Sequence, residues 1–156
     1  MTWKPNVTVA AVIEQDGKFL LIEEQTSDGL LFNQPAGHLE ANESLLAAVV
    51  RETMEESAYA FEPQYLIGIY RWHSPASDPS TSLKTGTTYL RFAFSGKILA
   101  HYPERPLDEG ILRTTWMTTE EIRDTQPRHR SPLVLRCVED FLVGRRYPLD
   151  ILSHYD

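Results

Sequence analysis

The sequence contains only one cysteine, Cys137, and no long apolar run. A single cysteine excludes a disulfide bond within the chain and is typical of proteins in a reducing compartment. No stretch approaches the roughly 20 apolar residues of a membrane-spanning helix, and no charged start followed by a short apolar run suggests a signal peptide. We therefore expect a cytoplasmic protein that has no membrane partner.

Basic residues are also scarce, because 15 Lys and Arg face 22 Asp and Glu, which gives a formal net charge of −7. This balance argues against a nucleic-acid partner, since proteins that bind the phosphate backbone present a basic face. An acidic protein that acts on an anionic small molecule needs cations between the two. The length of 156 residues and the hydrophobic content of 42% fit one domain over residues 1–156, as a monomer or a homodimer.

Hydrophobic runs and turn residues predict strands mixed with three helices, and therefore an α/β sandwich. Two β-rich runs at residues 7–13 and 18–23 flank Asp16-Gly17, which is a strong hairpin signal. Further strands are expected near residues 31–34, 65–72, 88–98 and 112–117. The helices are expected after residue 42, from Thr118, where a capping box begins, and from Ser131-Pro132 to Gly144. A Ser-, Pro- and Thr-rich loop is expected over residues 73–87.

Three glutamates stand at i, i+3 and i+4 in the first of these helices: Glu52, Glu55 and Glu56. In a helix they share one face, where like charges repel and weaken the helix by a few tenths of a kcal/mol per pair. A hard divalent cation reverses this effect, because Mg²⁺ or Mn²⁺ takes oxygen ligands and shares its site with substrate phosphates. The spacing therefore predicts a metal site.

The residues around these glutamates support this prediction. Gly37 lies in a break before the helix and allows a close backbone approach. Asn42 is expected to be the N-cap, with Glu43 in the first turn. Arg51 is spaced to pair with Glu43 or with Glu55, and so to hold the carboxylates in place.

The pattern Gly37, five residues, Glu43, seven residues, Arg51-Glu52, two residues, Glu55-Glu56 resembles the Nudix box of the Nudix hydrolases. Two positions depart from the family pattern, because Ala58 stands where Gly is usual and Thr53 where an aliphatic residue is usual. A Gly there would end the helix with a positive φ that is costly for Ala, so we expect the helix to end differently. Short stretches along nearly the whole chain, such as Asn-Gln-Pro-Ala-Gly-His-Leu-Glu-Ala, resemble the bacterial NudJ-type phosphatases.

The resemblance implies a Nudix-type α/β/α sandwich, with a mixed β-sheet and a loop-helix-loop metal site. It implies hydrolysis of phosphoanhydride bonds in nucleoside di- and triphosphates, or in the pyrimidine pyrophosphate precursor of thiamine, with release of phosphate. Mg²⁺, or Mn²⁺, is the implied cofactor. The expected ligands are Glu52, Glu55, Glu56 and the Gly37 carbonyl; the base is Glu52 or, as the alternative, Glu109.

Substrate contacts are expected outside the box. Arg91 lies on an open strand face beside Tyr89, where its guanidinium can grip phosphate in a forked contact. The aromatic residues Phe32, Trp72 and Tyr89 either stack a base or belong to the core and its rim. Asp108 and Glu109 form an acidic pair that is expected to supply a ligand or a base. The basic residues 128–130 are expected to be solvated surface.

Two other interpretations remain open. One is a Nudix fold that binds a nucleotide or metabolite without cutting it, which loss of a box carboxylate would favour; none is lost. The other is an isomerase of isoprenoid diphosphates, which needs a reactive thiol, and Cys137 is the only candidate.

Overall fold

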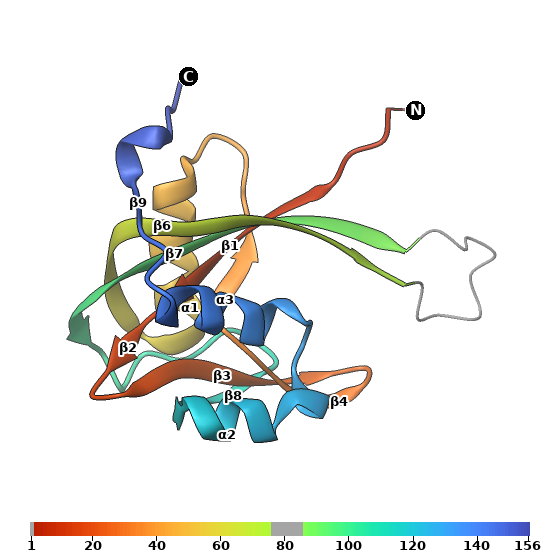
Figure 1. The fold of residues 1–156 in the computed structure, drawn as a ribbon, viewed down its shortest axis with the longest axis vertical. Coiled ribbons are helices and arrows are strands. Elements are labelled where there is room, and N and C mark those ends of the chain that lie inside the picture. The colour runs from red at the N-terminus through yellow and green to blue at the C-terminus, as the bar shows by residue number, and fades with distance from the viewer. Residues whose placement is uncertain (1, 76–85) are drawn as a thin grey trace.

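The computed structural model describes residues 2–75 and 86–156, which form two β-sheets and three α-helices (Figure 1). The strands are β1 Asn6–Val12, β2 Glu14–Gln15, β3 Lys18–Thr26, β4 Gly29–Asn33, β5 Ala36–His38, β6 Tyr59–Ser74, β7 Thr87–His101, β8 Ile111–Thr118 and β9 Tyr147–Pro148. The helices are α1 Leu45–Ser57, α2 Thr119–Asp124 and α3 Leu133–Leu142, with short 3-10 turns at Gln126–Arg128 and Leu149–Ile151. None of the described helices is both long enough and apolar enough to cross a membrane.

The larger sheet has the order β5-β1-β7-β6-β9 and is mixed, because β1 runs parallel to β7 and antiparallel to β5. In the smaller sheet, β3 pairs with β2, β4 and β8. The expected mixed α and β fold is confirmed. The expected loop at residues 73–87 is shorter at both ends, since β6 reaches Ser74 and β7 starts at Thr87; residues 76–85 lie outside the described residues.

Helices α1 and α3 pack on opposite faces of the larger sheet, and side-chain alternation along its strands explains why. On β6, Leu66 belongs to the core cluster with Val49 of α1, whereas its neighbour Ile67 belongs to the cluster with Val134 and Val138 of α3. The second cluster also takes in Phe19 of β3, so α3 joins the two sheets. The sheet is therefore covered by a helix on each side.

The Asp16-Gly17 hairpin is confirmed with the expected second arm, but its first arm differs from the expected one. Asp16 and Gly17 both have positive φ, 52° and 79°, as a tight two-residue turn requires. The turn joins the short β2 to β3. The earlier run, β1, instead pairs with β5 and β7 in the other sheet.

Helix α1 begins at a residue that the sequence did not indicate, and it ends at Ala58 in a conformation that was not expected for alanine. Its N-cap is Ser44, whose side chain accepts a hydrogen bond from Ala47 N at 3.0 Å, while Asn42 lies in the preceding turn with φ 66°. At the other end, Ala58 takes the left-handed conformation, φ 61° and ψ 21°, and its N–H donates to Met54 O. The expectation that Ala58 would change the helix end is wrong, because packing holds this alanine in the conformation that favours glycine.

Candidate active site

A cavity of about 650 Å³ lies beside α1 and β5 and extends to β6, β7 and the residues before β8. Seven carboxylate side chains and three arginines are among its lining residues. The acids are Glu24, Asp28, Glu40, Glu52, Glu55, Glu56 and Asp108, and the arginines are Arg51, Arg91 and Arg130. An anionic molecule therefore meets net negative charge here unless cations accompany it.

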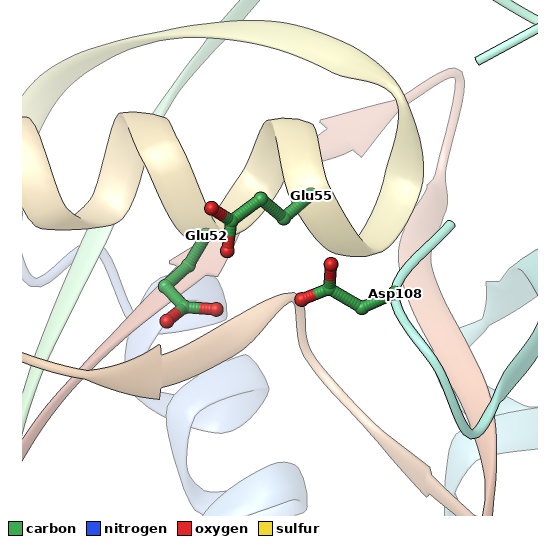
Figure 2. A group of neighbouring side chains, drawn as sticks. All are labelled: Glu52, Glu55 and Asp108. Atoms are coloured by element: carbon green, nitrogen blue, oxygen red, sulfur yellow. The ribbon is translucent and has the colours of Figure 1, made fainter. Parts of the chain in front are cut away.

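Three of these carboxylates converge. Glu52, Glu55 and Asp108 each offer one oxygen within 4.8 Å of the others. Figure 2 shows Glu52 and Glu55 projecting from α1, while Asp108 approaches from a separate segment. Oxygen donors brought together in this way match the preference of Mg²⁺ and Mn²⁺, so the donor set fits the cation that the helix spacing predicted.

The position of Asp108 depends on backbone hydrogen bonds to the end of α1. The N–H of Asp108 donates to Glu55 O at 3.0 Å, and the N–H of Tyr102 donates to Ala58 O at 2.9 Å. The segment before β8 is thus tied to the same helix end that carries the glutamates. Of the acidic pair that was expected to supply a ligand or a base, Asp108 lines the cavity and belongs to the cluster, whereas Glu109 is not among the lining residues. The role of Glu109 as the alternative base stays a prediction.

Glu52 and Glu56 are the most enclosed of the box glutamates. Burial raises the pKa of Glu52, against hydrogen bonds from Arg51 that lower it. Burial also raises the pKa of Glu56 to about 8, although its Oε1 accepts a hydrogen bond from Ala36 N at 2.9 Å. Glu56 lines the cavity with the three converging carboxylates, and a cation nearby would favour its charged form and so lower its pKa.

Arg51 holds the acidic residues in place, as its spacing indicated. Its Nε and Nη2 bind both oxygens of Glu43, at 3.0 and 2.7 Å, while Nη1 donates to Glu52 at 2.9 Å and to Glu55 at 3.1 Å. Nη2 also donates to His38 O on β5. The hydrogen bonds from Arg51 lower the pKa of Glu43, so this carboxylate stays ionised beside the arginine. The Arg51 guanidinium therefore connects β5 with the two glutamates that α1 contributes to the cluster.

Gly37 lies on β5, where it pairs with Val9 of β1, and it lines the cavity. Of the aromatic residues expected to bind substrate, Trp72 and Tyr89 line the cavity and stack on each other, with centroids 5.7 Å apart and planes at 20°. Phe32 does not: its ring is 2% exposed, and Arg128 lies over it. A ring enclosed in the core has no face to offer a substrate, so Phe32 takes the core position that the sequence analysis left open as the alternative to base stacking.

Arg91 lines the cavity, but its strand face is not open. Its side chain is 6% exposed and lies between the two sheets, where Asn33 and Gln34 accept its hydrogen bonds. The basic residues 128–130 are also more than solvated surface. Arg128 pairs with the buried carboxylate of Glu23, and Arg130 lines the cavity. The sequence analysis assigned no substrate contact to Asn33, Gln34 or Arg130. Asn33 and Arg130 line the cavity, and Gln34 bonds to Arg91, only because distant segments pack together.

The comparisons with known proteins agree on one family. The NUDIX domain family matches residues 2–137. The chain is 38% identical over 154 residues to Phosphatase NudJ of Escherichia coli strain K12 and to that of Shigella flexneri, covering 99% of this chain and 94% of each relative. A NUDIX hydrolase structure from Nitrosomonas europaea is 52% identical, with a TM-score of 0.88 over 97% of this chain and 98% of that one. The NUDIX domain of Shewanella oneidensis NrtR, a cocrystal with ADP ribose, shares the fold at 16% identity and a TM-score of 0.66, over 91% of this chain and 89% of that one.

Proposed function

Because this chain belongs to the Nudix hydrolase family, we propose that it hydrolyses phosphoanhydride bonds with Mg²⁺ as its cofactor. The proposed substrates are nucleoside di- and triphosphates or the pyrimidine pyrophosphate precursor of thiamine, and the proposed product is inorganic phosphate. Mn²⁺ is an alternative ion, since it shares the oxygen preference of Mg²⁺.

The observation that carries this proposal is the convergence of Glu52, Glu55 and Asp108 within 4.8 Å of one another in the lining of the cavity. These three side chains would hold the ion, and Glu56 and the Gly37 carbonyl are the further ligands that we propose, since both residues line the same cavity. When bound, Mg²⁺ neutralises phosphate charge and lowers the pKa of a coordinated water.

The residues of the chain then have distinct parts in the reaction. Glu52 accepts the proton of the attacking water at a carboxylate oxygen, and burial makes this carboxylate a stronger base than a solvated one. The water oxygen bonds to phosphorus while the phosphoanhydride P–O bond on the opposite side breaks, and the bridging oxygen leaves with the departing phosphate. Arg51 keeps Glu52 and Glu55 oriented during this step, while Trp72 and Tyr89 offer aromatic surface to the organic part of the substrate.

Of the two alternative functions, the buried position of Cys137 argues against the isomerase, whereas the binding module remains to be tested by activity measurements. The isomerase interpretation needs a reactive thiol, but Cys137 is fully buried and burial raises its pKa, so it remains a thiol away from the cavity surface. The binding-module interpretation predicts ligand binding without turnover, and activity measurements separate it from the hydrolase.

The test is a panel of nucleotides, sugar nucleotides, dinucleotides and thiamine precursors with Mg²⁺, scored separately for phosphate, pyrophosphate and nucleotide products. We expect phosphate release by the wild type and a loss of at least about a hundredfold in kcat for Glu55→Gln. The matched control is Glu104→Gln, at an exposed position outside the cavity, which should keep wild-type turnover. Binding of a substrate with no turnover would instead establish the binding module. Full activity of Glu55→Gln would show that Glu55 is not a metal ligand.

A further inference from the structure

Arg91 on β7 carries a buried positive charge whose hydrogen-bond partners are all neutral. Its Nη1 donates to Gln34 Oε1 at 3.0 Å and lies 4.0 Å from Cys137 Sγ, and its Nη2 donates to Asn33 Oδ1 at 3.0 Å. Because burial raises the pKa of Cys137, the thiol stays protonated and does not neutralise the arginine. The surroundings of Arg91 are therefore polar but uncharged.

This arrangement differs from that of the other enclosed arginine. Arg51 contacts four carboxylates within 4.0 Å, whereas Arg91 forms no ion pair with any carboxylate in residues 2–75 and 86–156. Taking a charge out of water without a counter-ion is costly, so a buried arginine usually has an anionic partner. Where the protein supplies none, a bound anion can take that place. The cavity supplies the route, since Arg91 is among its lining residues.

The neutral partners also fix the plane of the guanidinium. Gln34 is 1% exposed, and its Nε2 donates to Val134 O of α3 at 2.8 Å, so its Oε1 is held toward Arg91. An arginine has five N–H donors. The bonds to Gln34, Cys137 and Asn33 use Nη1 and one N–H of Nη2, which leaves Nε–H and the second Nη2–H without a partner among the described residues. Two N–H groups on one planar guanidinium are suited to bind phosphate oxygens.

We propose that Arg91 is an anion-binding residue that takes a phosphate group of the substrate, and that Asn33 and Gln34 are positioning residues whose neutrality keeps its charge available. The proposal rests on the hydrolase function proposed above, and it names a contact with phosphate that does not pass through the metal ligands. An amide oxygen orients the guanidinium as a carboxylate would, but leaves its charge for the substrate. An uncharged side chain at residue 33 is thus what the proposed phosphate site requires.

Asn33→Asp tests this directly, because it keeps the oxygen that accepts from Arg91, adds a negative charge and removes only the amide N–H donors. We expect KM for the best substrate to rise at least about tenfold, with kcat changed less than threefold, since the new carboxylate competes with phosphate for Arg91. The melting temperature should stay equal or rise, because a buried charge gains a partner. Gln64→Glu, at an exposed position on β6, adds the same charge away from the cavity and should leave KM unchanged.

A second measurement separates this proposal from the proposed function. Calorimetric titration of inorganic phosphate into Mg²⁺-loaded wild type and Asn33→Asp needs no turnover, and we expect at least about tenfold weaker phosphate binding by the variant. Arg91→Lys should lose part of the phosphate affinity, since an ammonium cannot make the forked contact. If Asn33→Asp has wild-type KM and wild-type phosphate affinity, Arg91 is a structural residue and the proposal is overturned. If no substrate of the panel is cut but phosphate binding still falls in Asn33→Asp, only the hydrolase proposal fails.

Discussion

The backbone of Gly37 on β5 lies directly against the carboxylate of Glu52 on α1. A Cβ atom built on residue 37 would overlap the carboxyl carbon and both oxygens of that side chain. Gly37 does not have a positive φ, so its backbone angles do not call for glycine. The close approach is what requires glycine at residue 37, and it restricts the Glu52 carboxylate to the space between β5 and α1.

Gly37→Ala should therefore push Glu52 out of the carboxylate cluster. We expect weaker Mg²⁺ binding and a fall of at least about a hundredfold in kcat, because misplacing a catalytic group by about 1 Å is that costly. Metal titration and steady-state kinetics measure both effects. Gly68→Ala is the matched control, since a Cβ there would also be crowded, but by the side chain of Tyr70. Equal metal affinity in wild type and Gly37→Ala would contradict the proposed role of this contact.

Asp108 and Glu109 are adjacent acids with opposite expected behaviour. If Mg²⁺ is about tenfold above its Kd, binding stabilises the folded protein by about 1.4 kcal/mol, or roughly 3–5 °C in melting temperature. Asp108→Asn should lose most of this rise together with turnover, whereas Glu109→Gln should keep both. The measurement is a thermal melt of chelator-treated protein with and without Mg²⁺. A larger loss in Glu109→Gln than in Asp108→Asn would show that the other acid binds the ion.

The raised pKa of Glu56 predicts how the stability of the metal-free protein depends on pH. Its pKa is about 8 in the folded chain and about 4.5 when unperturbed, because burial disfavours the charged form. The unfolded chain thus releases this proton at lower pH than the folded chain. The contribution of Glu56 to the free energy of unfolding is therefore fully present below about pH 4.5, and it is lost as the pH rises to about 8.

Urea unfolding in chelator at pH 5, 6, 7 and 8 measures this decline in the free energy of unfolding. Glu56→Gln should reduce the decline, since the amide has no proton to lose and its Oε1 still accepts the hydrogen bond from Ala36 N. Adding Mg²⁺ at pH 7 should release protons from the wild type and fewer from the variant. Parallel pH curves for the two proteins would show that Glu56 is not the titrating group.

Ala58 at the end of α1 is strained, so Ala58→Gly should stabilise the protein. Its φ of 61° costs an L-residue roughly 1–2 kcal/mol, which exceeds the roughly 0.8 kcal/mol that burial of its methyl group contributes. We expect a gain of up to about 1 kcal/mol, seen as a rise of about 2–4 °C in melting temperature with unchanged kcat. Ala58→Val should lower the melting temperature, because a β-branched residue is worse at positive φ. A lower melting temperature for Ala58→Gly would mean that the buried methyl outweighs the strain.

The parts of the site that the sequence predicted correctly depend on short-range geometry. Arg51 and Glu55 stand at i and i+4 in a helix, so their predicted contact follows from the spacing alone. The contact of Arg51 with the adjacent Glu52 was not predicted. The capping box at Thr118 and the Asp16-Gly17 turn are equally local, and both are present. The remaining errors near these elements, such as Asn42 in place of Ser44, concern one or two residues at an element end.

Contacts between distant segments were decided only by the tertiary structure. Nothing local distinguishes Asp108 from Glu109, since the choice depends on how the segment before β8 binds the end of α1. Arg91 and Gln34 are 57 residues apart, and only the packing of α3 against both sheets brings them together and buries them. Local spacing determines which side chains share a helix face, because backbone geometry repeats every few residues. Burial of a charge, and the partner that it contacts, depend on how helices and strands pack together. The spacing of residues along the chain does not determine that packing.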